Sequence, residues 1–231
     1  MPPNPHQRPG AGSRQPGGAA LRGAVPWAVL GIVAVAGFGL FLRFAHSGPL
    51  GLDEWWHASA AVTPGGAASA VAVFMAQVGG SAGAAACAAI ACALLLALRR
   101  ARDAAALATA MLLGVLLSET LKATVLRTRP WDQLYDSHGS SYPSGHSMGA
   151  AALAVSLALI VAGWRELGGR AARGAAVAAA CWILLMMWSR TALHVHWASD
   201  VLAGAVLGAC AAVIARWLWY RRAPSAPARM A

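Results

Sequence analysis

The chain is poor in charged side chains, and above all in acidic residues and lysine. Only 11% of its 231 residues are charged, Asp and Glu together number 8, and 17 of the 18 basic residues are arginine. Mean hydropathy is +0.57 and 58% of the residues are hydrophobic, outside the range of ordinary soluble domains. These values predict a membrane protein, built as one bundle of spanning helices.

Paired cysteines and internal repeats are also missing. The 4 cysteines lie singly inside apolar runs, without the spacing of a zinc or redox motif. No repeat is evident, which disfavours a transporter built from inverted repeats. The net charge of +10 resides in short arginine clusters between apolar runs, as expected of membrane proteins, so we predict no nucleic-acid partner.

The apolar runs predict an all-α fold of six transmembrane helices. Residues 24–220 would form the membrane domain, between a disordered cytoplasmic tail at 1–23 and a second cytoplasmic tail at 221–231. The spans are expected at about 24–42, 80–98, 104–126, 143–161, 174–188 and 199–217. Residues 55–98 carry no Asp, Glu, Lys or Arg, but glycine and proline break the run, so an extra interfacial helix is expected at about 66–78.

The distribution of basic residues predicts the orientation. Four segments on one side of the expected bundle hold 13 of the 18 basic residues, which identifies that side as cytoplasmic and places both termini there. The remaining five are Arg43, Lys122, Arg127, Arg129 and Arg190. We therefore expect an inner (plasma) membrane protein with its polar clusters on the extracytoplasmic face.

Three polar clusters stand out against the apolar background. They are Lys122 with Arg129-Pro130, then Pro143-Ser144-Gly145-His146, then Ser189-Arg190 with His196 and Asp200. Together they supply three cations, two histidines and a carboxylate. This set of groups is suited to cleaving a phosphate ester through a phosphohistidine.

The spacing within the clusters gives each a physical rationale. Lys122 and Arg129 are seven residues apart, so a helix continuing to about Thr128 would present both on one face. Ser144 is a candidate helix cap at a helix start that favours anions, and Gly145 would let a phosphate approach the backbone. His196 would lie four residues from its carboxylate partner, on the first turn of the last span.

At these residues the chain resembles the type 2 phosphatidic acid phosphatase superfamily, also called lipid phosphate phosphatases. The family pattern is K-x6-R-P, P-S-G-H and S-R-x5-H-x3-D, and every spacing is intact here. The resemblance implies a hydrolase of the bacterial integral-membrane branch, acting on lipid phosphates. Undecaprenyl diphosphate is the favoured substrate, with phosphatidylglycerophosphate and phosphatidic acid as alternatives.

The resemblance also implies the role of each residue. His196 would be the nucleophile, Asp200 its orienting partner, and His146 the acid that protonates the leaving group. Binding of the phosphate would fall to Lys122, Arg129, Ser144, Gly145 and Arg190. No metal ion and no cofactor are expected, because the cations take over the neutralising role of a metal.

Other interpretations remain open. His146, His194, His196 and Asp200 could instead bind a metal, although the three nearby cations would repel it. A membrane transporter is the alternative from a different class, and vanadium haloperoxidases share the three motifs but are soluble. Among the flanking residues, Glu119 is expected to pair with Lys122, whereas Arg127 and His194 would shape the site from outside.

Overall fold

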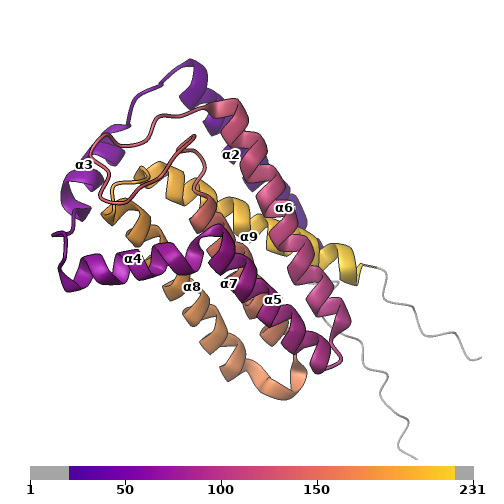
Figure 1. Ribbon diagram of the computed structural model, residues 1–231. Coiled ribbons are helices and arrows are strands. Elements are labelled where there is room, and N and C mark those ends of the chain that lie inside the picture. Colours follow the sequence, from indigo (N-terminus) through magenta and orange to yellow (C-terminus); the bar gives the residue numbers. More distant parts are fainter. Residues whose placement is uncertain (1–20, 222–231) are drawn as a thin grey trace, which may run out of the picture.

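The computed structural model describes residues 21–221, and all regular structure within that range is helical (Figure 1). The helices are α2 (Ala24–Phe44), α3 (Gly51–Ala60), α4 (Ala67–Gly79), α5 (Ser81–Ala97), α6 (Ala101–Val125), α7 (Gly145–Ala162), the short 3-10 helix η1 (Arg165–Leu167), α8 (Gly168–Ala192) and α9 (Ala198–Tyr220). The all-α prediction is confirmed. The predicted tails fall mostly outside the described residues, although the chain is already helical at Leu21, inside the segment expected to be disordered.

The predicted six-span membrane bundle agrees with the lengths and composition of the helices. Five helices are long and apolar enough to cross a membrane: the one from Leu21 to Phe44, and α6, α7, α8 and α9. A sixth crossing arises if α4 and α5, which meet at an angle of 64°, count as one broken span. Large apolar side chains such as Ile90 and Leu112 are exposed on the bundle surface, where lipid would surround them.

Two short helices, and not one, connect the first span to α5. The expected interfacial helix at about 66–78 is present as α4. Helix α3 was not predicted, because its ten residues mix two acidic residues, a histidine and two tryptophans and show no long apolar run. It begins where Asp53 accepts a hydrogen bond from the backbone N–H of Leu50, an N-terminal capping arrangement.

The centre of the bundle is a close crossing of α7 and α9. A Cβ atom at Gly204 would overlap the backbone carbonyl of Ser144, and one at Gly208 would overlap that of Met148. The two glycines are four residues apart, so they lie on one face of α9 and let the helix backbones touch. This contact sets the start of α7 directly against α9.

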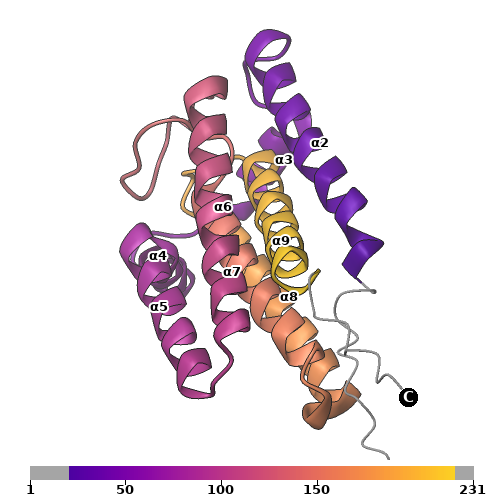
Figure 2. The same cartoon turned by 90° about the vertical axis from the view of Figure 1, so that its right-hand side faces the viewer.

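The loops that carry the polar clusters all lie at one end of the bundle. The α6–α7 loop, the α8–α9 loop and α3 meet at the upper left of Figure 1, whereas the α5–α6 and α7–α8 connections lie at the lower right. Figure 2 shows the same separation from the side. Residues far apart in the sequence therefore come together at a single end.

Candidate active site

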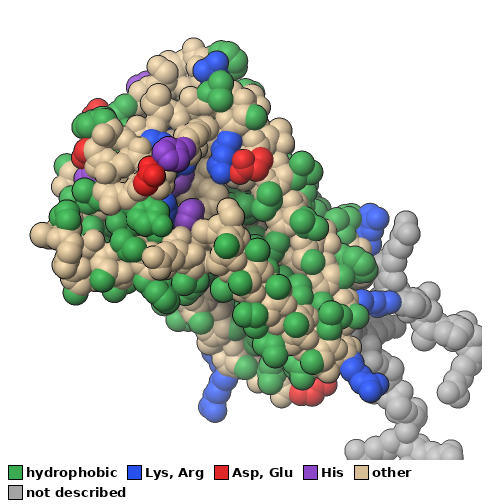
Figure 3. Space-filling model, in the orientation of Figure 1, with side chains coloured by type: hydrophobic (Ala, Val, Ile, Leu, Met, Phe, Trp, Pro, Cys, Tyr) green, Lys and Arg blue, Asp and Glu red, His purple; other side chains and the backbone are tan. Residues whose placement is uncertain are grey.

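A cavity of about 680 Å³ opens at this end, between α5, α6, α7 and the two loops. Figure 3 shows basic and histidine side chains gathered around a hollow at the corresponding part of the surface. Its lining includes six of the eight predicted site residues: Lys122, Arg129, Gly145, His146, Arg190 and His196. The three clusters thus converge on one space.

Arg190 has open hydrogen-bonding capacity toward this cavity. The residue is only 1% exposed, and its Nε and Nη1 atoms are buried without a hydrogen-bond partner. Its Nη2 atom has only a long contact of 3.5 Å with the Ser137 hydroxyl. Buried guanidinium donors are costly to leave unpaired, so a bound anion would satisfy them.

Lys122 reaches the cavity from the last turn of α6. Its Nζ atom lies 2.7 Å from a carboxylate oxygen of Glu119, which confirms the pairing predicted for these two residues. A Cβ atom at Gly145 would come within 3.2 Å of the Lys122 ammonium. Glycine at the start of α7 therefore leaves room for the ammonium beside the helix N-terminus.

Arg129 lies in the same cavity as Lys122, but a loop places it there and not the helix that was expected. Helix α6 ends at Val125, and Leu126 adopts a left-handed conformation with φ of 52°, so the seven-residue helical spacing does not apply. The guanidinium is instead held by backbone carbonyls, at 2.6 Å from Val195 and 3.0 Å from His138. The α6–α7 loop, and not a shared helix face, brings this cation to the cavity.

The second cluster opens α7 as predicted. Ser144 is the N-cap residue, and its hydroxyl accepts a hydrogen bond from the backbone N–H of Ser147. Ser144 is fully buried and does not line the cavity, so direct contact with phosphate remains a prediction. His146 Nε2 lies 3.0 Å from the backbone carbonyl of Ala76 in α4. Because a carbonyl only accepts, this ring nitrogen carries a proton, so donation to another group would use the second proton, on Nδ1, of the imidazolium form.

His196 is held between the cavity and a buried carboxylate. Its Nε2 atom faces Arg129 Nη1 at 3.3 Å, and its Nδ1 atom lies 3.7 Å from Asp200 Oδ2 and 3.4 Å from the hydroxyl of Ser141. An arginine only donates, so Nε2 is unprotonated and the proton resides on Nδ1. His196 precedes α9, so it does not lie on the first helical turn as expected, but the Asp200 carboxylate lies beside it, and the orienting role of Asp200 remains a prediction.

The environment keeps the His196 imidazole neutral. Burial lowers the pKa of His196 to about 4, and the positive charges of Arg129 and Arg190 act in the same direction, while Asp200 opposes them. A neutral imidazole with an unprotonated Nε2 is the form that can attack phosphorus, once the phosphoryl group takes the place of the Arg129 contact.

A buried network supports Asp200 and was not anticipated. Arg127 donates from Nη1 to Asp200 Oδ1 at 2.6 Å and from Nη2 to Asp53 Oδ2 at 2.7 Å. Asp53 also accepts from the Ser199 backbone N–H at 2.8 Å, and Ser141 donates to Asp200. The sequence offered one signal, because Asp53 is a rare acidic residue in this chain, but nothing in its spacing connected α3 with the third cluster.

The alternative metal-ligand set is not assembled. His194 does not line the cavity that contains His146 and His196. Its Nδ1 atom instead lies 2.9 Å from Asp132. Among residues 21–221, the one group of three potential ligands within coordinating distance is His57, Asp132 and His194. This group does not include His146, His196 or Asp200, the other residues of the alternative ligand set.

Sequence comparison assigns the family. The profile of the PAP2 superfamily matches residues 103–224, a stretch that contains all three clusters and more than half of the chain. The chain belongs to the PAP2 superfamily. This membership confirms the predicted family and the predicted enzyme class, a phosphoric ester hydrolase.

Two solved structures share the PAP2 fold with this chain. A transmembrane PAP2-type phosphatidylglycerolphosphate phosphatase from Bacillus subtilis aligns with a TM-score of 0.71 and 22% identity, over 84% of this chain and 94% of that one. LpxE from Aquifex aeolicus aligns with a TM-score of 0.59 and 20% identity, over 72% of this chain and 95% of that one. No curated protein matches the sequence.

Proposed function

We propose that this PAP2 protein hydrolyses a lipid phosphate or diphosphate through a phosphohistidine on His196, without a catalytic metal ion. The observation that carries the proposal is the pairing, in one cavity, of open guanidinium donors on Arg190 with an unprotonated Nε2 of His196. The first can bind the equatorial oxygens of a phosphoryl group, and the second can attack its phosphorus.

In the first step of the proposed cycle, Nε2 of His196 forms a bond to phosphorus. The bond from phosphorus to the leaving oxygen breaks, and His146 gives that oxygen a proton from its imidazolium form, which the bound phosphate anion favours. Positive charge from Lys122, Arg129 and Arg190 stabilises the transferring group. The proton on His196 Nδ1 stays directed toward Asp200 and Ser141, which stabilises the cationic phosphohistidine.

In the second step, water attacks the phosphohistidine. His146, now neutral, accepts a proton from this water and returns to its imidazolium form, and the bond between phosphorus and His196 Nε2 breaks. Inorganic phosphate leaves and both histidines return to their starting states. Charge and protons balance over the cycle without a divalent ion.

The shape of the cavity supports a lipid substrate that enters sideways from the bilayer. Beyond the charged groups, the cavity continues along α5 and α6 between apolar side chains that include Ala88, Cys92, Met111, Leu112 and Val115. A phosphate at the charged end would leave its hydrocarbon chain in this apolar part. We favour undecaprenyl diphosphate, with phosphatidylglycerophosphate, the substrate named for the Bacillus subtilis structure, and phosphatidic acid as alternatives.

Phosphate release from a panel of lipid phosphates in detergent, with chelator present, tests this function. The wild type should release phosphate, and His196→Gln and His146→Gln should each reduce kcat by about a thousandfold or more. His146 is also needed to hydrolyse the phosphohistidine, so this intermediate should decay slowly and accumulate in His146→Gln. It should not form in His196→Gln. Release that persists in His196→Gln, or that requires a divalent ion, would contradict the mechanism.

A further inference from the structure

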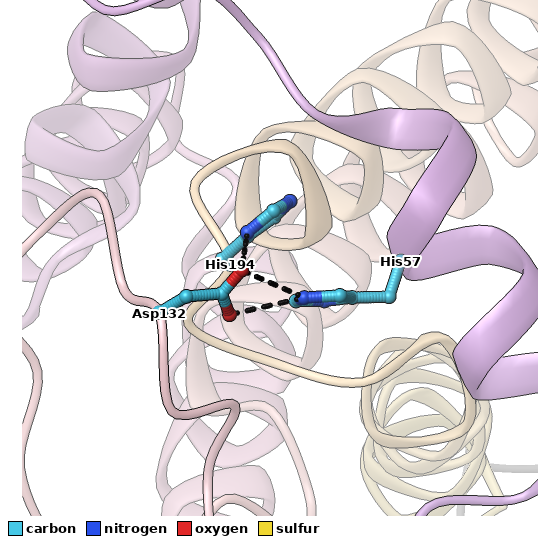
Figure 4. A group of neighbouring side chains, drawn as sticks. All are labelled: His57, Asp132 and His194. Atoms are coloured by element: carbon cyan, nitrogen blue, oxygen red, sulfur yellow. Dashed lines mark hydrogen bonds and ion pairs between the residues drawn. The ribbon is translucent and has the colours of Figure 1, made fainter.

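A second cluster of ionisable side chains lies outside the cavity, at the same end of the bundle. Figure 4 shows His57 from α3, Asp132 from the α6–α7 loop and His194 from the α8–α9 loop pointing toward one another. His57 Nε2 lies 3.0 Å from Asp132 Oδ1 and 3.1 Å from Oδ2, and His194 Nδ1 lies 2.9 Å from Oδ2. None of these three side chains has a role in the proposed hydrolysis.

The geometry of the cluster is close to that of a metal site. All three ligand atoms lie within 4.8 Å of one another. Around a tetrahedral Zn²⁺ with bonds of about 2.0–2.1 Å, ligand atoms are separated by about 3.3 Å. The two separations between an imidazole nitrogen and the carboxylate, 2.9 and 3.1 Å, therefore need to lengthen by only a few tenths of an ångström, and the two nitrogens lie within 4.8 Å of each other.

The charge of the cluster also favours a cation. Among the described side chains, no lysine or arginine is ion-paired with Asp132, whose contacts of this kind are to His57 and His194. The ion-pair partners of this carboxylate among the described side chains are thus the two imidazoles, and both can act as metal ligands.

Both access and tautomer allow coordination. The Asp132 side chain is 44% exposed, which leaves an open position for the ion and a water ligand. Without an ion, Nδ1 of His194 donates to the Asp132 carboxylate, and coordination moves this proton to Nε2, an atom that no other donor occupies. The rings of Trp131 and Trp197 pack beside His57, at centroid distances of 5.8 and 5.3 Å, and form an apolar wall.

We propose that His57, Asp132 and His194 bind a divalent transition-metal ion such as Zn²⁺, which joins α3, the α6–α7 loop and the α8–α9 loop. Two imidazoles and one carboxylate suit such an ion, with water as the fourth ligand. The site is structural, because the ion crosslinks the loops that carry Arg129 and His196 without lining the cavity. Without the ion, hydrogen bonds among the same groups hold the loops, so hydrolysis does not depend on it.

Titration of the chelator-stripped, full-length chain with Co²⁺ tests the site directly. The protein is kept in detergent and carries no polyhistidine tag, and visible absorption reports four-coordinate Co²⁺. We expect saturation at one Co²⁺ per chain, displacement by Zn²⁺, and a higher Tm in the presence of Zn²⁺. His57→Gln and Asp132→Asn should each lose the band and the Tm shift. The control His46→Gln, which removes an exposed histidine outside the cluster, should retain both.

Several results would overturn the site. These are the absence of a saturable band in the wild type, a band that survives both His57→Gln and Asp132→Asn, or a band that disappears in His196→Gln. X-ray absorption of the Zn²⁺-loaded wild type counts the imidazole ligands without any substitution. Fewer than two imidazole ligands would also overturn the site. Since all of these measure binding, they remain decisive even if the hydrolysis proposed above is wrong.

Discussion

At the scale of single residues, the proposed mechanism depends on a histidine, His196, that its surroundings keep neutral. His196 is 3% exposed and has a pKa of about 4, so its neutral form prevails at every pH well above that value. Attack requires the neutral form. The pH dependence of the reaction therefore reports directly on the burial of this side chain.

Activity should persist into mildly acidic solution. We predict that protonation of His196 lowers kcat/KM only as pH falls through about 4, because the lowered pKa keeps the proposed nucleophile neutral down to that pH. The measurement is a pH profile of kcat/KM, with ionisation of the substrate phosphate, near a pKa of about 6, titrated by phosphorus NMR and divided out. A remaining acidic limb near the ordinary histidine pKa would show that His196 is solvated.

Arg127 is the residue on which the support of His196 depends. It lies between the buried carboxylates of Asp53 and Asp200, so its loss leaves two negative charges without a cation. Arg127→Gln should lower the free energy of unfolding by about 3–5 kcal/mol. Unfolding is measured by denaturant titration in detergent, with Arg43→Gln, at the exposed end of α2, as the control expected to have little effect.

A double-mutant cycle separates the network from its individual members. If Arg127 acts by neutralising Asp53, the pair Arg127→Gln and Asp53→Asn should cost less than the sum of the two single changes. Additive costs would mean that the two residues contribute independently, contrary to the direct contact of 2.7 Å between them.

At the scale of helices, the contact of α7 with α9 sets the position of the site. Gly208 lets α9 approach the α7 backbone. Asp200 of the third cluster lies in the first turn of α9, and the second cluster begins α7. Gly208→Ala places a Cβ atom against the Met148 carbonyl, and the overlap should cost about 1–3 kcal/mol and lower Tm by several degrees. The measurement is thermal unfolding in detergent.

Gly37 provides the matched control for this substitution. It also lies within a helix, α2, but a Cβ atom there would meet nothing within 4 Å. Gly37→Ala should be neutral or slightly stabilising, because alanine has the higher helix propensity. Equal effects at the two positions would contradict a specific close packing of α7 on α9.

At the scale of the whole molecule, the separation of charge between the two ends predicts the orientation in the membrane. The arginine clusters of the α5–α6 and α7–α8 connections lie opposite the cavity. In intact cells, a membrane-impermeant maleimide should therefore label Asp136→Cys, in the exposed α6–α7 loop, without permeabilisation.

Arg170→Cys supplies the opposite case. It lies at the start of α8, on the other end of the bundle, and should be labelled only after the cells are permeabilised. The reverse pattern would place the cavity on the cytoplasmic side and overturn the proposed topology.

The amino-acid sequence by itself determined the class of protein, the approximate spans and the family. Long apolar runs must be helical in a membrane, because every backbone polar group needs an internal partner there. The spacing in the three clusters was equally informative, since Lys122, His146 and His196 stand in a pattern specific to one superfamily.

Only the tertiary structure decided how these residues meet and what supports them. Arg129 reaches the cavity through loop carbonyls because α6 ends earlier than its apolar run suggests. Asp53 supports the third cluster, and His57 meets Asp132, across separations of 146 and 75 residues. Such contacts depend on how helices pack and where loops fold back, and neither local periodicity nor motif spacing contains that information.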